Sequence, residues 1–186
     1  MTRLVCLTGF MGAGKTTVGV PLARQLAWRF EDLDTRIENY TNLTIPAIFE
    51  RLGEPAFRQI ESAQLEAALA RAAESRESLV LALGGGTYAQ AGMVERLRSA
   101  AALVIWIDCP VEQLLARCTT MANRPLFRDE PTFRQLLASR LPFYERADHR
   151  VSGADEPQRV VENILSLPPF GRLRRDAEEC ATRVKP

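Results

Sequence analysis

The chain has 186 residues, a length typical of one compact domain with a sizeable core. Its formal net charge is +1, so the composition predicts no general attraction to nucleic acid or to an acidic membrane surface. The only histidine is His149, which excludes metal sites and mechanisms that need several histidines.

The chain begins with a short apolar run that leads into a glycine-rich loop. Residues 3–7, RLVCL, are predicted to form a buried parallel strand, and residues 16–28 have apolar side chains at helical spacing. Between them, Gly9 to Thr16 fit G-x-x-x-x-G-K-[ST], the phosphate-binding loop. Lys15 would add positive charge at the β- and γ-phosphates, and the Thr16 hydroxyl suits a Mg²⁺ ligand. The segment therefore predicts a loop that holds the phosphates of a nucleotide.

The second predicted strand, residues 28–34, carries two carboxylates, Asp32 and Asp34. Alternation along an extended chain puts both on the same side, and ligands of open α/β sheets bind at the carboxyl ends of strands. One carboxylate could hold Mg²⁺ through water while the other accepts a proton from an attacking hydroxyl. The alternative is a solvated acidic turn that caps the next helix.

A helix-rich block, residues 34–76, separates the second strand from the third. Helices are predicted at residues 34–41, 45–53 and 54–74, and Arg58 lies in the last of them. The block is too long for a simple crossover, which predicts a small helical lobe. The third strand, residues 78–86, ends in Gly84, Gly85 and Gly86, whose backbone N–H groups we expect close to a ligand. A plain flexible turn is the alternative.

The rest of the chain continues to alternate. We expect a strand at residues 102–109, a helix at 110–121, a loop at 119–132, a helix at 132–147, a short strand at 149–153 and a helix at 157–167. Pro142 should stop or kink the helix that carries Arg140, and Arg124 falls in the loop. The tail after Pro168 is expected to be a loose helix or disordered. The order predicts an α/β fold with a parallel sheet covered on both faces.

Several motifs together resemble the shikimate kinase family. They are GFMGAGKTTVG, FEDLDTRIE, IPAIFERLGEPAFRQIE, LALGGGT, ANRPLF and RLPFYERAD, and they span roughly the first 165 residues. The resemblance implies a P-loop three-layer sandwich with a central parallel sheet. It implies a single kinase domain at residues 1–168, with a helical substrate-binding lobe at about 34–76 and a mobile lid at about 119–132. Residues 169–186 would form the tail.

The resemblance also implies an activity and residue roles. The γ-phosphoryl of ATP would pass, with Mg²⁺, to the 3-hydroxyl of shikimate, in the pathway to chorismate and aromatic amino acids. The catalytic residues would be Lys15, Asp34 as the base, and Arg124; Thr16 and, through water, Asp32 would serve the metal. The ATP contacts would be Gly12, Ala13, Gly14, Lys15, Thr16, Thr17, Arg117 and Arg124. The shikimate contacts would be Asp34, Arg58, Gly84, Gly85, Gly86, Arg140, Phe49 and Phe57.

Two other functions fit parts of the same pattern. Another small-molecule kinase of this fold, acting for example on gluconate, would share the loop and the lid. A regulator that binds ATP without turnover would be expected to lack Lys15, Asp34 or the substrate arginines, all of which are present.

The first apolar run is too short for a secretory signal, and no segment approaches the roughly 20 apolar residues of a membrane span. We therefore expect a cytoplasmic protein, and, without an exposed apolar stripe, a monomer.

Overall fold

A parallel sheet forms the centre of the structure, a computed structural model that describes residues 3–75, 77–119 and 129–170. Within these residues the sheet has five strands in the order β2-β3-β1-β4-β5, all parallel to their neighbours. The strands are β1 (Leu4–Thr8), β2 (Arg29–Asp32), β3 (Leu79–Ala82), β4 (Leu103–Asp108) and β5 (His149–Ser152). Every residue of β1 and β3 is buried, which explains why their sequences are apolar rather than alternating.

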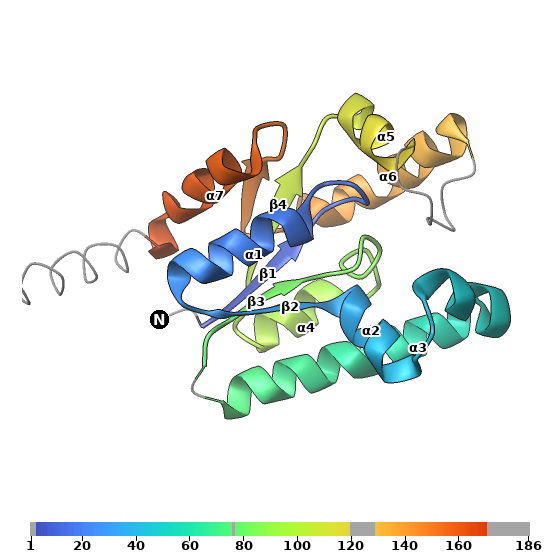
Figure 1. Cartoon of the computed structure of the whole chain (residues 1–186), viewed down its shortest axis with the longest axis horizontal. Coiled ribbons are helices and arrows are strands. Elements are labelled where there is room, and N and C mark those ends of the chain that lie inside the picture. The colour runs from blue at the N-terminus through green and yellow to red at the C-terminus, as the bar shows by residue number, and fades with distance from the viewer. Residues whose placement is uncertain (1–2, 76, 120–128, 171–186) are drawn as a thin grey trace, which may run out of the picture.

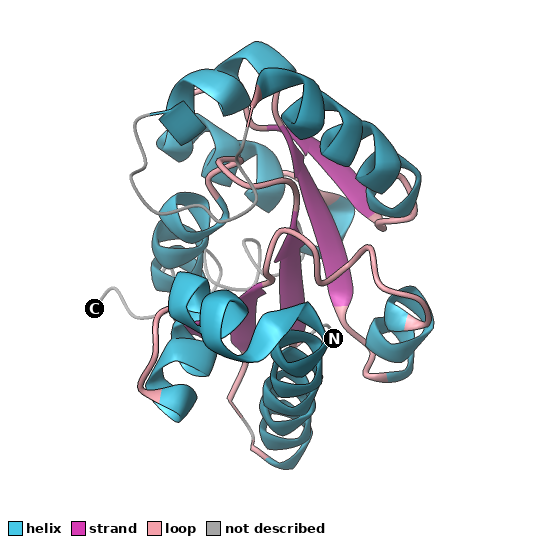
Figure 2. Cartoon of the chain, turned by 90° about the vertical axis from the view of Figure 1, so that its right-hand side faces the viewer, coloured by secondary structure: helices cyan, strands magenta, loops and turns pink. Residues whose placement is uncertain are grey.

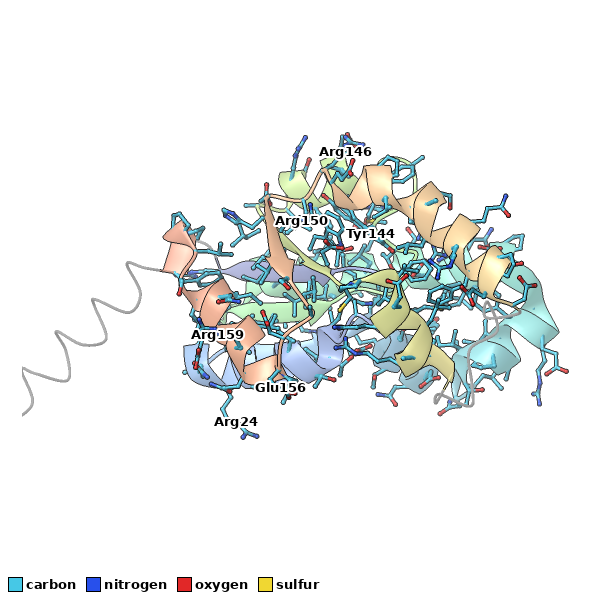
Figure 3. The ribbon with its side chains drawn as sticks, turned by 90° about the horizontal axis from the view of Figure 1, so that it is seen from above. Arg24, Tyr144, Arg146, Arg150, Glu156 and Arg159 are labelled. Carbon is cyan, nitrogen blue, oxygen red and sulfur yellow. The ribbon has the colours of Figure 1, made fainter. Side chains whose placement is uncertain are left out.

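Helices cover both faces of this sheet and so form three layers (Figure 2). Helices α1 (Lys15–Leu26) and α7 (Pro157–Leu165) pack against each other on one face, whereas α4 (Met93–Ser99) and α6 (Glu130–Tyr144) lie on the other (Figures 1 and 3). Helix α5 (Val111–Thr119) follows β4. The predicted α/β class, with a central parallel sheet and flanking helices, is confirmed.

Helices α2 (Leu33–Thr41) and α3 (Ile45–Glu74) pack against each other within the predicted helical lobe. In Figure 1 they lie at the lower right, across from α5 and α6 at the upper right. The backbone of α3 is broken at Gly53, whose φ of 78° and ψ of 169° are not helical. The break falls at the predicted boundary between two helices, because this backbone conformation is open essentially to glycine alone.

Three details differ from the sequence-based expectations. Strand β2 ends at Asp32, so Asp34 lies in the first turn of α2 and not at the end of a strand. Helix α6 includes Pro142 and ends only at Tyr144. A proline this close to the end of a helix removes one hydrogen bond from a turn that is about to finish. Helix α4 has only seven residues, too few for a clear periodic signal, and was not predicted.

Parts of the predicted lid and tail lie outside the described residues. These parts are residues 120–128, with Arg124, and residues 171–186, with Cys180. At the start of the predicted tail, Phe170 is buried, and its ring centroid lies 6.4 Å from that of Trp28. In the part of the chain that is described, no helix is both long and apolar enough to cross a bilayer.

Gly19 sets how closely α1 approaches the sheet. A Cβ at this position would stand 2.4 Å from Phe30 Cε2 and 3.1 Å from Leu7 Cδ1. We expect Gly19→Ala to lower the free energy of unfolding by about 1–2 kcal/mol, because overpacking outweighs the better helix propensity of alanine. Urea denaturation measures this. Val20→Ala, at an exposed neighbour, should change the value by about 0.5 kcal/mol or less, and equal stability of Gly19→Ala and the unchanged protein would contradict the close approach.

Candidate active site

The phosphate-binding loop connects β1 to α1. Helix α1 begins at Lys15, directly after Gly14, whose φ of 87° lies in the left-handed region. The Lys15 ammonium donates to the carbonyls of Gly9 at 2.9 Å and Phe10 at 3.1 Å, so it lies over the loop. A helix N-terminus, converging backbone N–H groups and a lysine together form a site for phosphate oxygens.

A cavity of about 350 Å³ opens beside this loop. The loop residues predicted to bind ATP all line it, and they are Gly12, Ala13, Gly14, Lys15, Thr16 and Thr17. Asp32, Asp34 and Arg117 line it as well. The turn between β5 and α7 completes the wall with Gly153 and Pro157, which the sequence-based reasoning missed because they lie more than a hundred residues from the loop.

Asp32 connects the loop to α2 through both of its carboxylate oxygens. Its Oδ2 accepts a hydrogen bond from Thr16 Oγ1 at 2.6 Å. Its Oδ1 accepts from the N–H groups of Asp34 at 3.0 Å and Thr35 at 3.2 Å, which caps the helix. Asp32 and Asp34 therefore reach the cavity through a helix cap and not through the alternation of a strand. The alternative, an acidic turn that caps the next helix, is thus present, and it is part of the site.

The Thr16–Asp32 pair fits Mg²⁺, which prefers oxygen ligands. Among the described residues, no group of three or more His, Cys, Asp or Glu side chains could hold a metal ion. Few ligands from the described residues fit the usual way Mg²⁺ is held, by one or two protein carboxylates together with substrate phosphates and water.

Arg117, on α5, connects two parts of the nucleotide cavity. Its guanidinium donates to the carbonyls of Gly12 at 3.2 Å and Gly153 at 3.4 Å, and it approaches Cys109 Sγ at 3.2 Å. A planar cation held in this way presents a flat surface for an aromatic base.

A second cavity, of about 290 Å³, lies next to the first. All the residues predicted to contact shikimate line it, and they are Asp34, Arg58, Gly84, Gly85, Gly86, Arg140, Phe49 and Phe57. Residues that were not predicted also line it, among them Met11, Glu38 and Glu61. Asp34 lines both cavities, so it lies where a phosphoryl donor bound in one cavity and a phosphoryl acceptor bound in the other would meet.

The glycine triplet lets several charged side chains approach one stretch of backbone. A Cβ on Gly86 would stand 3.0 Å from Nη2 of Arg58 and 3.0 Å from Nη2 of Arg140. A Cβ on Gly84 would stand 2.9 Å from Asp34 Oδ1. Arginines from α3 and α6 thus meet at one turn, although 82 positions separate them in the sequence (140 − 58).

The two arginines differ in how their charge is balanced. Arg58 forms ion pairs with Glu61 at 2.8 Å and Glu54 at 3.0 Å. Burial alone would lower the pKa of Arg58, but these carboxylates outweigh it and raise the pKa above its ordinary value. Arg140 is 7% exposed and has no acidic partner within ion-pair distance among the described residues. Burial lowers its pKa, and the nearby Arg58 lowers it further. The part of the cavity next to Arg140 is therefore suited to an anion.

Glu61 organises the wall behind Arg58. It is 1% exposed and accepts hydrogen bonds from Arg58, from Thr87 Oγ1 at 2.5 Å and from Gln90 Nε2 at 2.6 Å. The sequence-based reasoning did not single it out. The available signal was its position three residues after Arg58 on a helix, a spacing at which opposite charges meet.

A phosphate-binding loop beside a cavity that contains two arginines, with a carboxylate between the loop and the cavity, is typical of a P-loop kinase that acts on a small anionic molecule. A family model described as shikimate kinase matches residues 11–168. The chain belongs to the shikimate kinase family. This confirms the predicted family and the predicted enzyme class, an ATP-dependent kinase. At the level of the family it also confirms the predicted function.

Individual relatives and structures agree with this assignment. A shikimate kinase from Synechococcus sp. (strain CC9902) is 41% identical over 172 residues, covering 90% of this chain and 86% of its own. One from Persephonella marina is 35% identical, covering 92% and 99%. The structure of a shikimate kinase from Acinetobacter baumannii in complex with shikimate has a TM-score of 0.80 and 38% identity, covering 89% and 92%. A gluconokinase from Sinorhizobium meliloti, at 18% identity and a TM-score of 0.57, shares the fold.

Replacing Glu61 should destabilise the protein far more than replacing another glutamate of the same helix. Glu61→Ala removes a buried acceptor from Thr87, which is buried, and from Arg58 and Gln90, which are half-buried, with an expected loss of about 3–5 kcal/mol in the free energy of unfolding. Glu66→Ala removes an exposed carboxylate that pairs with Arg96, and it should cost about 1 kcal/mol or less. Urea denaturation of both variants tests this. Similar losses in the two variants would contradict a larger contribution of the Glu61 network to the free energy of unfolding.

Proposed function

We propose that the chain transfers the γ-phosphoryl group of ATP to the 3-hydroxyl of shikimate, which gives shikimate 3-phosphate and ADP. The observation that carries this is the position of Asp34, which lines both the nucleotide cavity and the cavity with two arginines. Membership of the shikimate kinase family supports shikimate as the acceptor.

On the donor side, the backbone of the loop and Lys15 hold the ATP phosphates. A phosphoryl transition state is loose and rich in negative charge, so it is stabilised by cations rather than by a covalent intermediate. Thr16, and Asp32 through water, would hold Mg²⁺, which neutralises charge on the phosphate oxygens when bound. Arg117 would pack on the adenine. Arg124, outside the described residues, is proposed as a further cation for the phosphates on the strength of the family resemblance.

On the acceptor side, Arg58 and Arg140 would bind the carboxylate of shikimate with charge-assisted hydrogen bonds. Asp34 would accept the proton of the 3-hydroxyl as this oxygen attacks the γ-phosphorus. Phe49 and Phe57, whose ring centroids lie 4.5 Å apart, would form the apolar wall of the ring site. The backbone at Gly84, Gly85 and Gly86 would close over the ring, because no side chain stands in the way.

The finer expectations about the protein's setting belong to the same proposal. We propose a cytoplasmic monomer whose ligands are ATP, Mg²⁺ and shikimate. A reducing compartment suits the three described cysteines, Cys6, Cys109 and Cys118, which are buried as free thiols. Binding of the protein to a nucleic acid or to lipid vesicles at physiological salt would contradict this set of ligands.

The choice of acceptor is tested by measuring ADP release in a coupled assay with shikimate and with gluconate in parallel. We expect Mg²⁺-dependent turnover with shikimate and no turnover above background with gluconate. Turnover with gluconate alone would replace the proposed acceptor. ATP binding without turnover on either compound would favour a regulator.

Lys15→Ala should abolish turnover and leave the fold intact. The variant removes a positive charge from the β- and γ-phosphates, and the loss of one preorganised transition-state contact costs roughly a hundredfold or more in kcat. ADP release measures the loss, and thermal unfolding is the control for folding. A folded variant with near-normal turnover would contradict the assigned loop.

Variants of the acceptor site should separate the two substrates. Arg58→Ala and Arg140→Ala should each weaken shikimate binding by roughly tenfold to a hundredfold, because each loses a charge-assisted hydrogen bond, while ATP affinity changes little. Asp34→Asn should lower kcat more than it lowers nucleotide affinity. Titration of both substrates and turnover are measured for each variant. Arg96→Ala, at a surface ion pair, is the control. If the two arginine variants lost affinity for ATP and kept their affinity for shikimate, the assignment of the acceptor to this cavity would be wrong.

A further inference from the structure

Tyr144 is a buried side chain that lies behind the wall of the second cavity, the acceptor cavity, which Arg58 and Arg140 line. It is labelled in Figure 3. It is the last residue of α6, one turn after Arg140, and it has no exposed surface. Its hydroxyl donates a hydrogen bond to the carbonyl oxygen of Gly85 at 2.5 Å. It does not line the cavity, and the proposed function gives it no role.

The Gly85 carbonyl receives a second hydrogen bond from the same helix. Arg140 Nη1 donates to this oxygen at 3.2 Å, a longer contact than that of Tyr144. The next residue, Gly86, lies against Arg140 Nη2 and Arg58 Nη2. One carbonyl thus connects the tyrosine, the glycine turn and one of the arginines proposed to bind the carboxylate.

The ring of Tyr144 is supported from the sheet. It stacks on Trp106 of β4, with ring centroids 6.0 Å apart and an interplanar angle of 30°. The guanidinium of Arg150 lies over the Trp106 ring at 4.8 Å, and Arg150 Nε donates to Asp108 Oδ2 at 2.9 Å. The contacts with the sheet hold the ring, and through it the hydroxyl, in one place.

We propose that Tyr144 is a positioning residue, which fixes the Gly85 carbonyl so that Arg140 can direct its remaining N–H groups to the acceptor's carboxylate. The Gly85 carbonyl is partly buried, and a carbonyl that is partly removed from water is stabilised by a protein donor. Without the tyrosine hydroxyl, Arg140 would be its only side-chain donor in the described structure, and the guanidinium would be drawn toward the carbonyl and away from the bound anion. This inference rests on the proposed function.

The hydroxyl remains a donor over the working pH range. Burial raises the pKa of Tyr144 to about 12, although the nearby Arg140 opposes this rise. The phenol therefore keeps its proton near neutral pH and acts through a hydrogen bond, not through charge. A phenolate at this place would compete with the substrate for Arg140, and burial prevents it.

Tyr144→Phe tests the proposal, because phenylalanine keeps the ring and its stacking on Trp106 and removes only the hydroxyl. We expect the KM and the Kd for shikimate to rise by about threefold to tenfold, the effect of one hydrogen bond. The Kd for ATP and the kcat at saturating shikimate should change less than about twofold. Tyr88→Phe is the matched control, because Tyr88 is also buried but lines neither cavity. The KM and Kd for shikimate and the Kd for ATP of this variant should not change.

A double-mutant cycle shows whether the hydroxyl acts through Arg140. In an Arg140→Ala background, Tyr144→Phe should raise the Kd for shikimate by less than it does with Arg140 present, because the residues share one carbonyl. Equal effects in both backgrounds would overturn the proposal. So would an unchanged Kd for shikimate in Tyr144→Phe, or equal weakening of shikimate and ATP. Absence of turnover on shikimate in the unmutated protein would instead overturn the proposed function, and the positioning role with it.

Discussion

The hydrogen bonds of the Asp32 carboxylate position the rest of the site. One oxygen accepts from Thr16 at the start of α1, and the other accepts from two N–H groups at the start of α2. A single side chain therefore fixes where both helices begin relative to the end of β2. A helix cap of this kind stabilises by about 0.5–2 kcal/mol, but its effect here is mainly geometric. It places Asp34 in the first turn of α2, between the two cavities.

The acceptor cavity keeps two guanidinium groups in proximity, and the surrounding structure balances only part of that charge. Arg58 has two carboxylate partners, and the buried one, Glu61, is itself satisfied by Thr87 and Gln90. Arg140 has the carbonyl of Gly85. Removing a charge from water without an opposite charge is costly, so an anion bound here recovers free energy that folding leaves unrealised. The proposed binding of a carboxylate at this site thus rests on the incomplete balance of charge around Arg140.

How far the sequence predicts this site depends on the distance in sequence between the interacting groups. The phosphate loop is local, because Gly9, Lys15 and Thr16 lie within eight consecutive residues, and its strand and helix could be read directly. The arginines could be selected from the 24 basic residues only through the family resemblance, since they meet by folding. Asp32 and Asp34 do line the predicted cavity, but the reason given, alternation along a strand, is wrong, because β2 ends at Asp32. Five residues of sequence do not distinguish a helix-capping turn from the end of a strand.

Apart from the ion pair of Glu61 with Arg58, the contacts of the missed residues join groups that are distant in the sequence. Glu61 bonds to residues 26 and 29 positions away, and Tyr144 bonds to a carbonyl 59 positions away. No periodicity or spacing reports such contacts. What the sequence did contain was the glycine triplet, the place where these contacts meet. Asp34, Glu61 and Arg140 all approach its backbone within distances that a Cβ would obstruct.

The same triplet offers a physical reason for the choice between a ring acid and a linear polyhydroxy acid such as gluconate. Side chains adapt to a flexible ligand by changing rotamers, but a backbone turn held by Tyr144, Arg140 and the end of β3 cannot. The backbone turn forms one wall of the cavity, and the Phe49–Phe57 pair forms an apolar wall. Arg58 and Arg140 form its charged end. Such a shape favours a small, rigid ring with one carboxylate, which loses little conformational entropy on binding. The fold shared with the gluconokinase does not decide this, because specificity depends on the side chains and backbone of the acceptor cavity.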